Sequence, residues 1–459
     1  MAARATARMQ YTLDPRIETY APANNGKPGQ LSFLIWLFVL GWVTQEFTLF
    51  DVGKYSIPLI YLVAIPFCAK ATPKSTTFLA LPLVSFAMAA VVGLLQGGIN
   101  PMAIVSQGAL QLLAIFFAAG VASIDWRTQL RTLTKSMVVI GAPVVLFGGY
   151  QMFARTYKWK YAFLPVTNQQ AYAMGGFQRG WEKEQFSRAS SLFVEPSEFG
   201  YFCLWLMLLG LTATKARWRM PALILSFAGI LFSQSLSAVL GAAVLIICYA
   251  AVNSINLNVV RKVAIVLVAC AMAILLVQPL APQAFDEFYT RIEQAVTLDN
   301  RADSGRVDHL PANWLIFKDA PVFGSGLASI SSADANGVDV TTFTYFLMLI
   351  ERGIVGTCFF LAPWVWLGWR AIKLPKTDDF RAPCVLFSAL NLYTFSTSSM
   401  AYTLFYWLAL GICASCILRT YLPTTHLAVA DFGNMDADEL PNRFETPVGN
   451  IDESGQSPT

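Results

Sequence analysis

Residues 236–252 read LSAVLGAAVLIICYAAV and contain no charged side chain. A helix of about 20 apolar residues crosses the ~30 Å hydrocarbon core of a bilayer, so this stretch predicts a membrane span. An isolated strand would leave its backbone groups unsatisfied in lipid, and a transmembrane barrel strand would alternate polar and apolar residues, which this stretch does not. The stretch therefore predicts a transmembrane helix.

The same pattern recurs along the chain. Of the 459 residues, 56% are hydrophobic and only 13% are charged, about half the charged fraction of soluble proteins. We therefore predict an all-α polytopic membrane protein with about 12 transmembrane helices. The predicted spans are residues 31–50, 57–69, 77–95, 103–123, 136–153, 196–212, 221–234, 236–252, 263–279, 342–369, 384–399 and 402–418.

Basic residues between the spans predict the orientation, because cytoplasmic loops carry an excess of Lys and Arg. If residues 1–30 are a cytoplasmic segment, both termini are cytoplasmic, the transmembrane domain covers 31–423, and residues 424–459 form an acidic, disordered cytoplasmic tail. Every cytoplasmic loop is then basic. These loops carry Lys70, Lys74, Arg127, Arg131, Lys135, Lys215, Arg217, Arg219, Arg261, Lys262, Arg370, Lys373, Lys376, Arg381 and Arg419.

Two long loops, at about 154–195 and 281–341, face the opposite side and also contain Arg and Lys. Long loops are exempt from the charge rule, so these cations are either solvated charges on an outer cap or parts of a site. The net charge is +4 and the basic residues are scattered, so we expect no nucleic-acid partner. With only two histidines and no cysteine in either loop, we expect no metal site and no disulfide framework there.

The first long loop ends with the sequence RASSLFVEPSEFG, residues 188–200. Pro196 suits the first turn of a helix, and Glu195 and Glu198 would favour its N-terminus by about 0.3–1 kcal/mol. Helix capping alone does not explain why Arg188 comes shortly before them.

The second long loop holds three consecutive patterns. Residues 303–309 read DSGRVDH, residues 310–319 form an amphipathic stretch that could lie along the membrane interface, and residues 321–326 read PVFGSG. Beyond the loop, Glu351 and Arg352 stand inside an apolar run. Charges at that depth are costly and usually face a cavity or a partner.

Together these residues resemble the O-antigen polymerase and O-antigen ligase superfamily of bacterial inner-membrane glycosyltransferases. The family shows an Arg shortly before Phe-x-(Glu/Asp)-Pro-Asn, which Arg188 and residues 193–196 match, with Ser197 in the Asn place. The family's second loop shows Ser-Gly-Arg, an aromatic helix and Pro-x-x-Gly-x-Gly. Residues 304–306, Trp314 and residues 321–326 match these.

A third family element is His-Asn-x-Tyr-Leu followed by Glu-x-Gly-x-x-Gly. Tyr345, Glu351, Gly353 and Gly356 fit its spacing, but Thr342 and Phe343 occupy the His-Asn places. In ligases this histidine is regarded as catalytic, whereas polymerases tolerate its absence better. The resemblance therefore favours a polymerase, and a ligase stays the alternative.

The resemblance implies a GT-C-like fold in the bacterial inner membrane, with both long loops in the periplasm. It implies an enzyme that polymerises undecaprenyl-diphosphate-linked oligosaccharide repeat units into a surface polysaccharide or exopolysaccharide. The sugar–diphosphate bond supplies the energy, so no nucleotide or other cofactor is expected, and the sequence has no phosphate-binding Gly-rich loop. Expected partners are the lipid bilayer, a chain-length regulator and a flippase of the same pathway.

Such a reaction needs cations for the leaving diphosphate and a base for the incoming hydroxyl. We assign Arg188 and Arg306 to the diphosphate and Glu195 to the base, with Glu351, His309 and Glu198 as alternative bases. Tyr345 would hold the diphosphate or a sugar. The loop aromatic residues that could stack on sugars are Trp159, Tyr161, Trp181 and Trp314.

Two other classes of membrane protein are compatible with the sequence. A transporter or flippase could have a similar number of spans, but transporters often contain repeats with broken helices in matching positions. The two halves of this chain show no such match. A non-catalytic membrane scaffold is the other alternative.

Overall fold

The computed structural model describes residues 28–45, 48–52, 55–96, 99–157, 159, 189–193, 195–213, 216–253, 278–280, 282–296, 310–330, 344–394 and 403–421. The chain divides into two compact units, Met1–Ile417 and Leu418–Thr459, and the description below concerns the first. In chain order the elements are α1 (Pro28–Val43), β1 (Thr48–Val52), β2 (Tyr55–Pro58), α2 (Leu59–Cys68), α3 (Pro73–Thr77), α4 (Ala80–Leu95), α5 (Pro101–Ser123), α6 (Trp126–Thr156), α9 (Pro196–Thr212), α10 (Ala216–Ser233), α11 (Leu236–Val252), η1 (Gln278–Leu280), α13 (Pro282–Val296), α14 (Leu310–Asp319), α16 (Thr344–Lys373), α17 (Arg381–Thr394) and α18 (Leu404–Tyr421).

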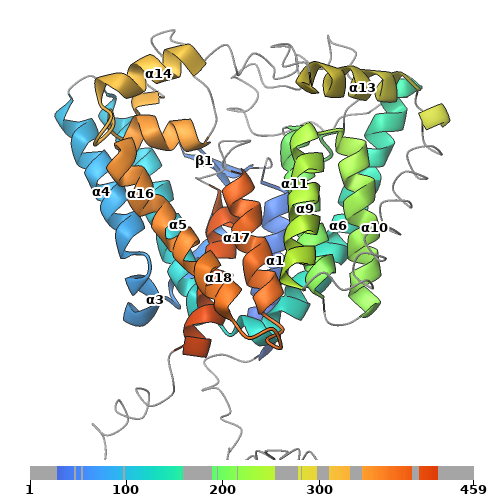
Figure 1. Ribbon diagram of the computed structural model, residues 1–459, viewed down its shortest axis with the longest axis horizontal. Helices are drawn as coiled ribbons and strands as arrows, with labels where there is room; N and C mark the ends of the chain where they lie inside the picture. The colour runs from blue at the N-terminus through green and yellow to red at the C-terminus, as the bar shows by residue number, and fades with distance from the viewer. Residues whose placement is uncertain are drawn as a thin grey trace, which may run out of the picture. The chain divides into compact units, whose positions relative to one another are not determined.

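The first unit is a helical bundle with the character of a membrane protein (Figure 1). Among the described residues, three helical stretches are long and apolar enough to cross a membrane: Pro101–Ser123, Trp126–Ala154 and Tyr345–Lys373. Shorter apolar helices accompany them in α1, α2, α4, α11 and α18. These helices confirm the prediction of a helical membrane protein with several spans. The number of spans and the loop layout stay predictions, and most of the predicted span 263–279 lies outside the described residues.

Several helices begin and end where the sequence predicts, and the differences have local causes. Helices α9 and α11 coincide with their predicted spans. Helix α6 starts at Trp126, well before residue 136, because Asp125 accepts a hydrogen bond from the backbone N–H of Arg127 (3.1 Å) and thereby starts the helix on polar residues.

A hairpin is the exception to the all-α prediction within the described residues. Helix α1 ends at Val43, and β1 and β2 then pair antiparallel, with Val52 opposite Tyr55 and Thr48 opposite Pro58. The segment contains Phe50, Val52 and Tyr55, and such aromatic and β-branched residues favour strands. The predicted first span, 31–50, therefore ends too late.

Helices α9 and α18 form the centre of the unit. Helix α9 is buried from Phe199 to Gly210 and α18 from Leu404 to Ile417. A helix that is apolar all round is stable only when other helices surround it. Aromatic contacts fix α18 against its neighbours, because Phe405 stacks on Trp42 of α1 (3.8 Å between ring centroids) and Tyr406 packs on Trp364 of α16 (4.7 Å).

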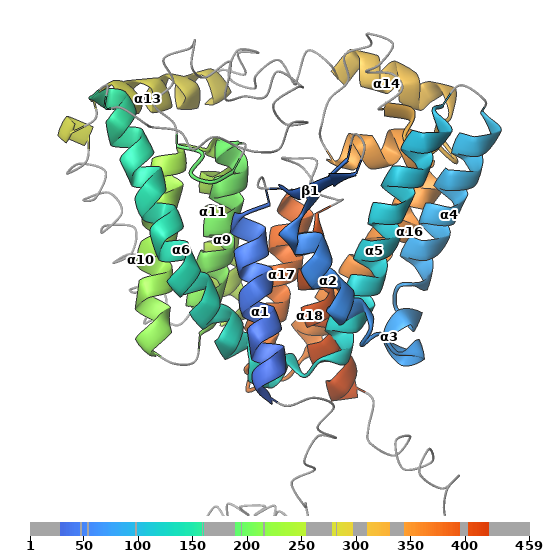
Figure 2. The ribbon, with the colours of Figure 1, turned by 180° about the vertical axis from the view of Figure 1, so that it is seen from behind.

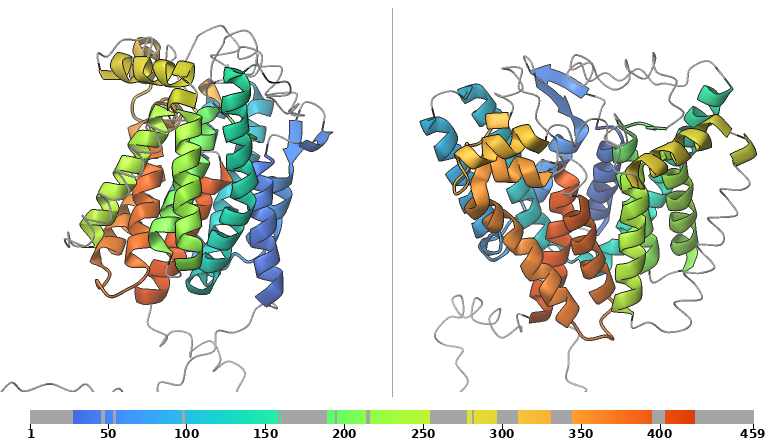
Figure 3. Two further views of the ribbon diagram at one scale, coloured as in Figure 1. Left: turned by 90° about the vertical axis from the view of Figure 1, so that its right-hand side faces the viewer. Right: turned by 45° about the horizontal axis from the view of Figure 1, so that its top comes forward.

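Helices α13 and α14 lie across one end of the bundle (Figures 1 and 2). Helices α9, α11 and α16 begin at this end, and α6, α10 and α17 finish there. The start of α16 lies beside α14, as the tilted view in Figure 3 shows. Residues that are far apart in the sequence therefore meet at the end that carries α13 and α14.

The opposite end carries basic residues at the helix ends. They lie at the start of α6 (Arg127, Arg131), α10 (Arg217, Arg219) and α17 (Arg381), and at the end of α16 (Arg370, Lys373).

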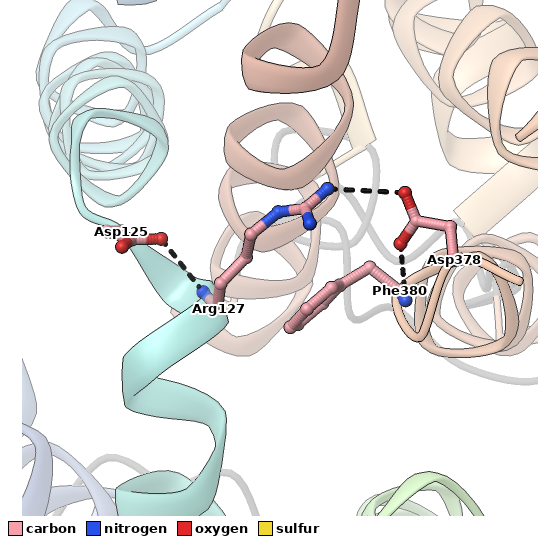
Figure 4. Close-up of polar contacts among 4 residues, drawn as sticks. All are labelled: Asp125, Arg127, Asp378 and Phe380. Atoms are coloured by element: carbon pink, nitrogen blue, oxygen red, sulfur yellow. Dashed lines mark hydrogen bonds and ion pairs between the residues drawn. The ribbon is translucent and has the colours of Figure 1, made fainter. Parts of the chain in front are cut away.

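A small polar cluster joins the start of α6 to the loop between α16 and α17 at this basic end (Figure 4). Arg127 forms an ion pair with Asp378 (3.3 Å), and its guanidinium lies over the Phe380 ring at 4.8 Å. The other carboxylate oxygen of Asp378 accepts the backbone N–H of Phe380 (2.8 Å). The start of α6 is thereby tied to the loop between α16 and α17.

Candidate functional site

The start of α9 carries two of the predicted acidic residues. Glu195 occupies the N-cap position with an extended backbone, Pro196 follows at the first helical position, and Glu198 lies in the first turn. The Glu195 side chain does not cap the helix. Its carboxylate instead accepts a hydrogen bond from the Ser197 hydroxyl (2.8 Å). Simple capping therefore does not account for Glu195, which is only half-buried.

The segment just before Glu195 is anchored to α6. The Gln151 amide forms two hydrogen bonds with the backbone of Ser191, accepting its N–H (2.7 Å) and donating to its carbonyl (3.0 Å). The Ser191 hydroxyl donates to the Val144 carbonyl (2.6 Å). Ser191 has a φ of 53°, a backbone conformation that is uncommon for a residue with a side chain. These bonds hold the chain in place immediately before Glu195.

The PVFGSG loop after α14 is hydrogen-bonded to a bend in α16. Ser325 N–H donates to the Ile350 carbonyl (2.7 Å) and Gly326 N–H to the Glu351 carbonyl (3.1 Å). In return, Ile354 N–H donates to the Pro321 carbonyl (2.9 Å). We call this arrangement the glycine interlock. It consists of residues 321–326 and residues 350–355.

Glycine is required where the two segments of the interlock meet. Gly353 has φ 62° and ψ −171°, which interrupts α16. A Cβ on Gly353 would lie 2.3 Å from the Val322 carbonyl oxygen, and a Cβ on Gly324 would lie 2.4 Å from the Arg352 nitrogen. The loop reaches α4 in the same way, because a Cβ on Gly326 would lie 2.3 Å from the Gly93 nitrogen. The two glycine patterns noted in the sequence are therefore halves of one contact.

Glu351 and Arg352 are both 1% exposed and bond to different segments around the interlock. The Glu351 carboxylate accepts the backbone N–H of Ala328 (3.1 Å), which follows the PVFGSG loop. Arg352 donates to the Ser85 hydroxyl of α4 (3.0 Å) and to the Gln111 side-chain oxygen of α5. The contact of Glu351 is structural, and its use as an alternative base stays a prediction.

The end of α17 links three helices that begin or pass near this end of the bundle. The Tyr345 hydroxyl of α16 donates to the Leu392 carbonyl (2.8 Å), and the Tyr393 hydroxyl donates to the Ser237 carbonyl of α11 (2.6 Å). The Tyr201 hydroxyl of α9 donates to the Asn391 side-chain oxygen (3.1 Å). The sites around Glu195 and around the interlock are therefore connected through α17.

The structure describes only some of the predicted site residues. Arg188, Arg306 and His309 lie outside the described residues, as do Tyr161 and Trp181. Trp314 lies on α14, is 47% exposed and packs on Phe317 (5.3 Å between ring centroids).

Sequence reasoning missed five buried polar side chains: Ser85, Gln111, Gln151 and Asn391, which bond to neighbouring segments, and Gln234 in the turn between α10 and α11. Each is a polar side chain within or at the end of a hydrophobic segment, and that position could have singled it out. The segments that these side chains contact could not be predicted without the fold.

The fold and these contacts define a multi-pass α-helical membrane protein with a polar site at one end of its bundle. The sequence model of the O-antigen ligase family matches residues 221–361. This match is consistent with the O-antigen polymerase and ligase superfamily and implies a membrane enzyme that processes glycans. Neither the curated proteins nor the solved structures include a match to this chain.

Proposed function

We propose that this protein is a membrane glycosyltransferase that polymerises undecaprenyl-diphosphate-linked repeat units into a bacterial surface polysaccharide or exopolysaccharide. One observation carries the proposal. The matched segment, 221–361, contains both halves of the glycine interlock, and α17 connects the interlock to the Glu195 region. The family match and the polar contacts thus point to the same end of the bundle.

The proposed reaction transfers a growing glycan from one lipid carrier to the next repeat unit. A hydroxyl of the acceptor sugar attacks the anomeric carbon of the donor, and the bond from that carbon to the diphosphate oxygen breaks. Glu195 accepts the proton of the hydroxyl, and undecaprenyl diphosphate leaves with the bonding electron pair. Arg188 and Arg306 stabilise the charge that develops on the diphosphate.

The proposed orientation places the end with α13 and α14 in the periplasm. The described helix ends at the other end of the bundle carry Arg127, Arg217, Arg370 and Arg381. An excess of Lys and Arg favours the cytoplasmic side. Glu195 would then face the compartment in which the lipid-linked glycan is presented, in the inner membrane of a bacterium.

A ligase is the second candidate, and the matched family carries that description. A ligase would transfer the finished glycan to a different acceptor. Thr342 in place of the family's histidine favours a polymerase. The lipid-linked glycans of a deletion strain separate the two, because single repeats accumulate without a polymerase and long lipid-linked chains accumulate without a ligase.

The test of the proposed base is Glu195→Gln, which preserves the size of the side chain but removes its ability to accept a proton. We expect polymer formation from isolated lipid-linked repeat units to fall by at least about 100-fold, since general bases contribute roughly 10²–10⁴ in rate. Asp319→Asn, an exposed acid at the end of α14, is the matched control and retains activity. Full activity of Glu195→Gln in a folded protein would overturn the assignment.

A further inference from the structure

Gln234 occupies the turn between α10 and α11 in a conformation that is costly for its residue type. Its side chain is 3% exposed and its backbone φ is 46°. Non-glycine residues at positive φ store about 1–3 kcal/mol of strain in such regions, and strained residues cluster at binding and active sites. A glycine would avoid this strain at position 234.

The buried side-chain amide of Gln234 also lowers the stability of the folded protein. Within the described part of the chain, neither its oxygen nor its nitrogen has a hydrogen-bond partner. The neighbouring serines do have partners: the Ser233 hydroxyl donates to the Ile230 carbonyl (2.9 Å), and the Ser235 and Ser237 hydroxyls bond to each other (2.8 Å). A buried polar group without a partner costs about 1–3 kcal/mol. Both the backbone strain and the unpaired amide lower the stability of the protein, and another residue would avoid both. We therefore infer that the Gln234 amide forms hydrogen bonds with a bound ligand.

The turn that holds Gln234 packs against the start of α9. A Cβ on Gly200 would lie 2.6 Å from the Ala238 Cβ and 3.5 Å from the Ser233 hydroxyl, so α9 and the turn are in close contact. Ser197 lies one helical turn before Gly200 on the same face of α9, and its hydroxyl bonds to Glu195. The turn that carries Gln234 therefore packs against the first turns of α9, whose N-cap residue is the proposed base Glu195.

We propose that the Gln234 amide recognises a sugar of the lipid-linked repeat unit, and this inference rests on the proposed function. An amide offers one acceptor and two donor hydrogens, and a pair of sugar hydroxyls or an acetamido group matches both kinds. A diphosphate offers acceptors only, which would leave the Gln234 side-chain oxygen without a hydrogen-bond donor. Gln234 is thus a specificity-determining residue for the glycan and not a group that holds the diphosphate.

The first experiment measures the stability of the purified protein in detergent without substrate. Gln234→Leu replaces an amide that has no partner, so the unfolding temperature stays equal or rises, and Gln234→Gly raises it by relieving the positive φ. The matched control is Gln151→Leu. Gln151 is 1% exposed, and both its amide oxygen and its amide nitrogen bond to Ser191, so we expect its variant to unfold at a lower temperature. A comparable loss in Gln234→Leu would show a structural role and overturn the inference.

The second experiment compares two probes on the wild type and on Gln234→Leu. The probes are undecaprenyl diphosphate alone and the lipid-linked repeat unit isolated from a strain that lacks this gene. We expect the affinity for the repeat-unit lipid to fall about tenfold, the equivalent of 1.4 kcal/mol, while the affinity for the bare lipid stays unchanged.

The outcomes of the second experiment separate the two proposals. An equal loss for both probes, or no loss for either, overturns the role of Gln234 and leaves the proposed function standing. Failure of the wild type to bind either lipid overturns both.

Discussion

Gly353 shows at the scale of one residue how strictly the bend in α16 depends on sequence. A Cβ at this position would meet main-chain atoms of the facing loop, the Val322 carbonyl oxygen at 2.3 Å and the Gly324 nitrogen at 2.5 Å. Main-chain atoms held by hydrogen bonds cannot rotate away as a flexible side chain could. Any side chain at this position would therefore force the backbone of the loop or of α16 to shift.

We expect Gly353→Ala to lower the free energy of unfolding by at least about 3 kcal/mol, because backbone strain and the clash with the loop add together. Thermal unfolding in detergent and the steady-state protein level in the membrane measure this loss. Gly368→Ala is the matched control in the same helix, because its Cβ would make ordinary contacts with Ser388, at 3.5 Å and 3.7 Å. An unchanged unfolding temperature in Gly353→Ala would contradict the interlock.

At the scale of the helices, Arg352 joins three elements. It extends from α16 to Ser85 of α4 and Gln111 of α5, and its guanidinium lies 4.9 Å from the centroid of the Phe360 ring. A guanidinium is planar and presents several donors in fixed directions, whereas an ammonium is a compact point charge. The contact therefore depends on geometry as well as on charge.

We expect Arg352→Lys to destabilise the packing of α4 and α5 against α16, although it retains the positive charge. We expect the free energy of unfolding to fall by about 1–3 kcal/mol, because the shorter Lys side chain leaves the Ser85 hydroxyl or the Gln111 side-chain oxygen without its hydrogen bond from residue 352. Thermal unfolding and limited proteolysis in detergent report the change. The exposed Lys373→Arg serves as the control. If Arg352→Lys matches the wild type, charge alone is sufficient at this position.

The sequence was most informative about elements and least informative about contacts between them. The bounds of α9 and α11 were predicted correctly, because long apolar runs of near-span length mark helices in a membrane protein. The early start of α6 and the hairpin after α1 were missed, because local polar bonds and β-forming residues decided them. Motif spacing singled out Glu195 and the two glycine patterns, but it could not show that these patterns touch each other.

At the scale of the whole molecule, the separation of the basic end from the end with α14 predicts a definite topology. We replace the native cysteines and introduce Lys318→Cys on α14 and Lys376→Cys in the loop before α17, both exposed positions. If the end with α14 is periplasmic, we expect a membrane-impermeant maleimide to label residue 318 in cells whose outer membrane has been opened. We expect it to label residue 376 only after the inner membrane is permeabilised. Labelling in the reverse pattern would overturn the proposed orientation.

The glycine interlock also determines which positions of the loop tolerate substitution. Its bonds run between main-chain atoms, and its close contacts depend on the absence of side chains at the glycines, so the shape of the loop does not depend on the side chains of its other residues. The side chains of Val322 and Phe323, which are 49% and 53% exposed, can therefore be replaced without breaking these main-chain bonds. The surface of this loop can thus change without rebuilding the bundle beneath it.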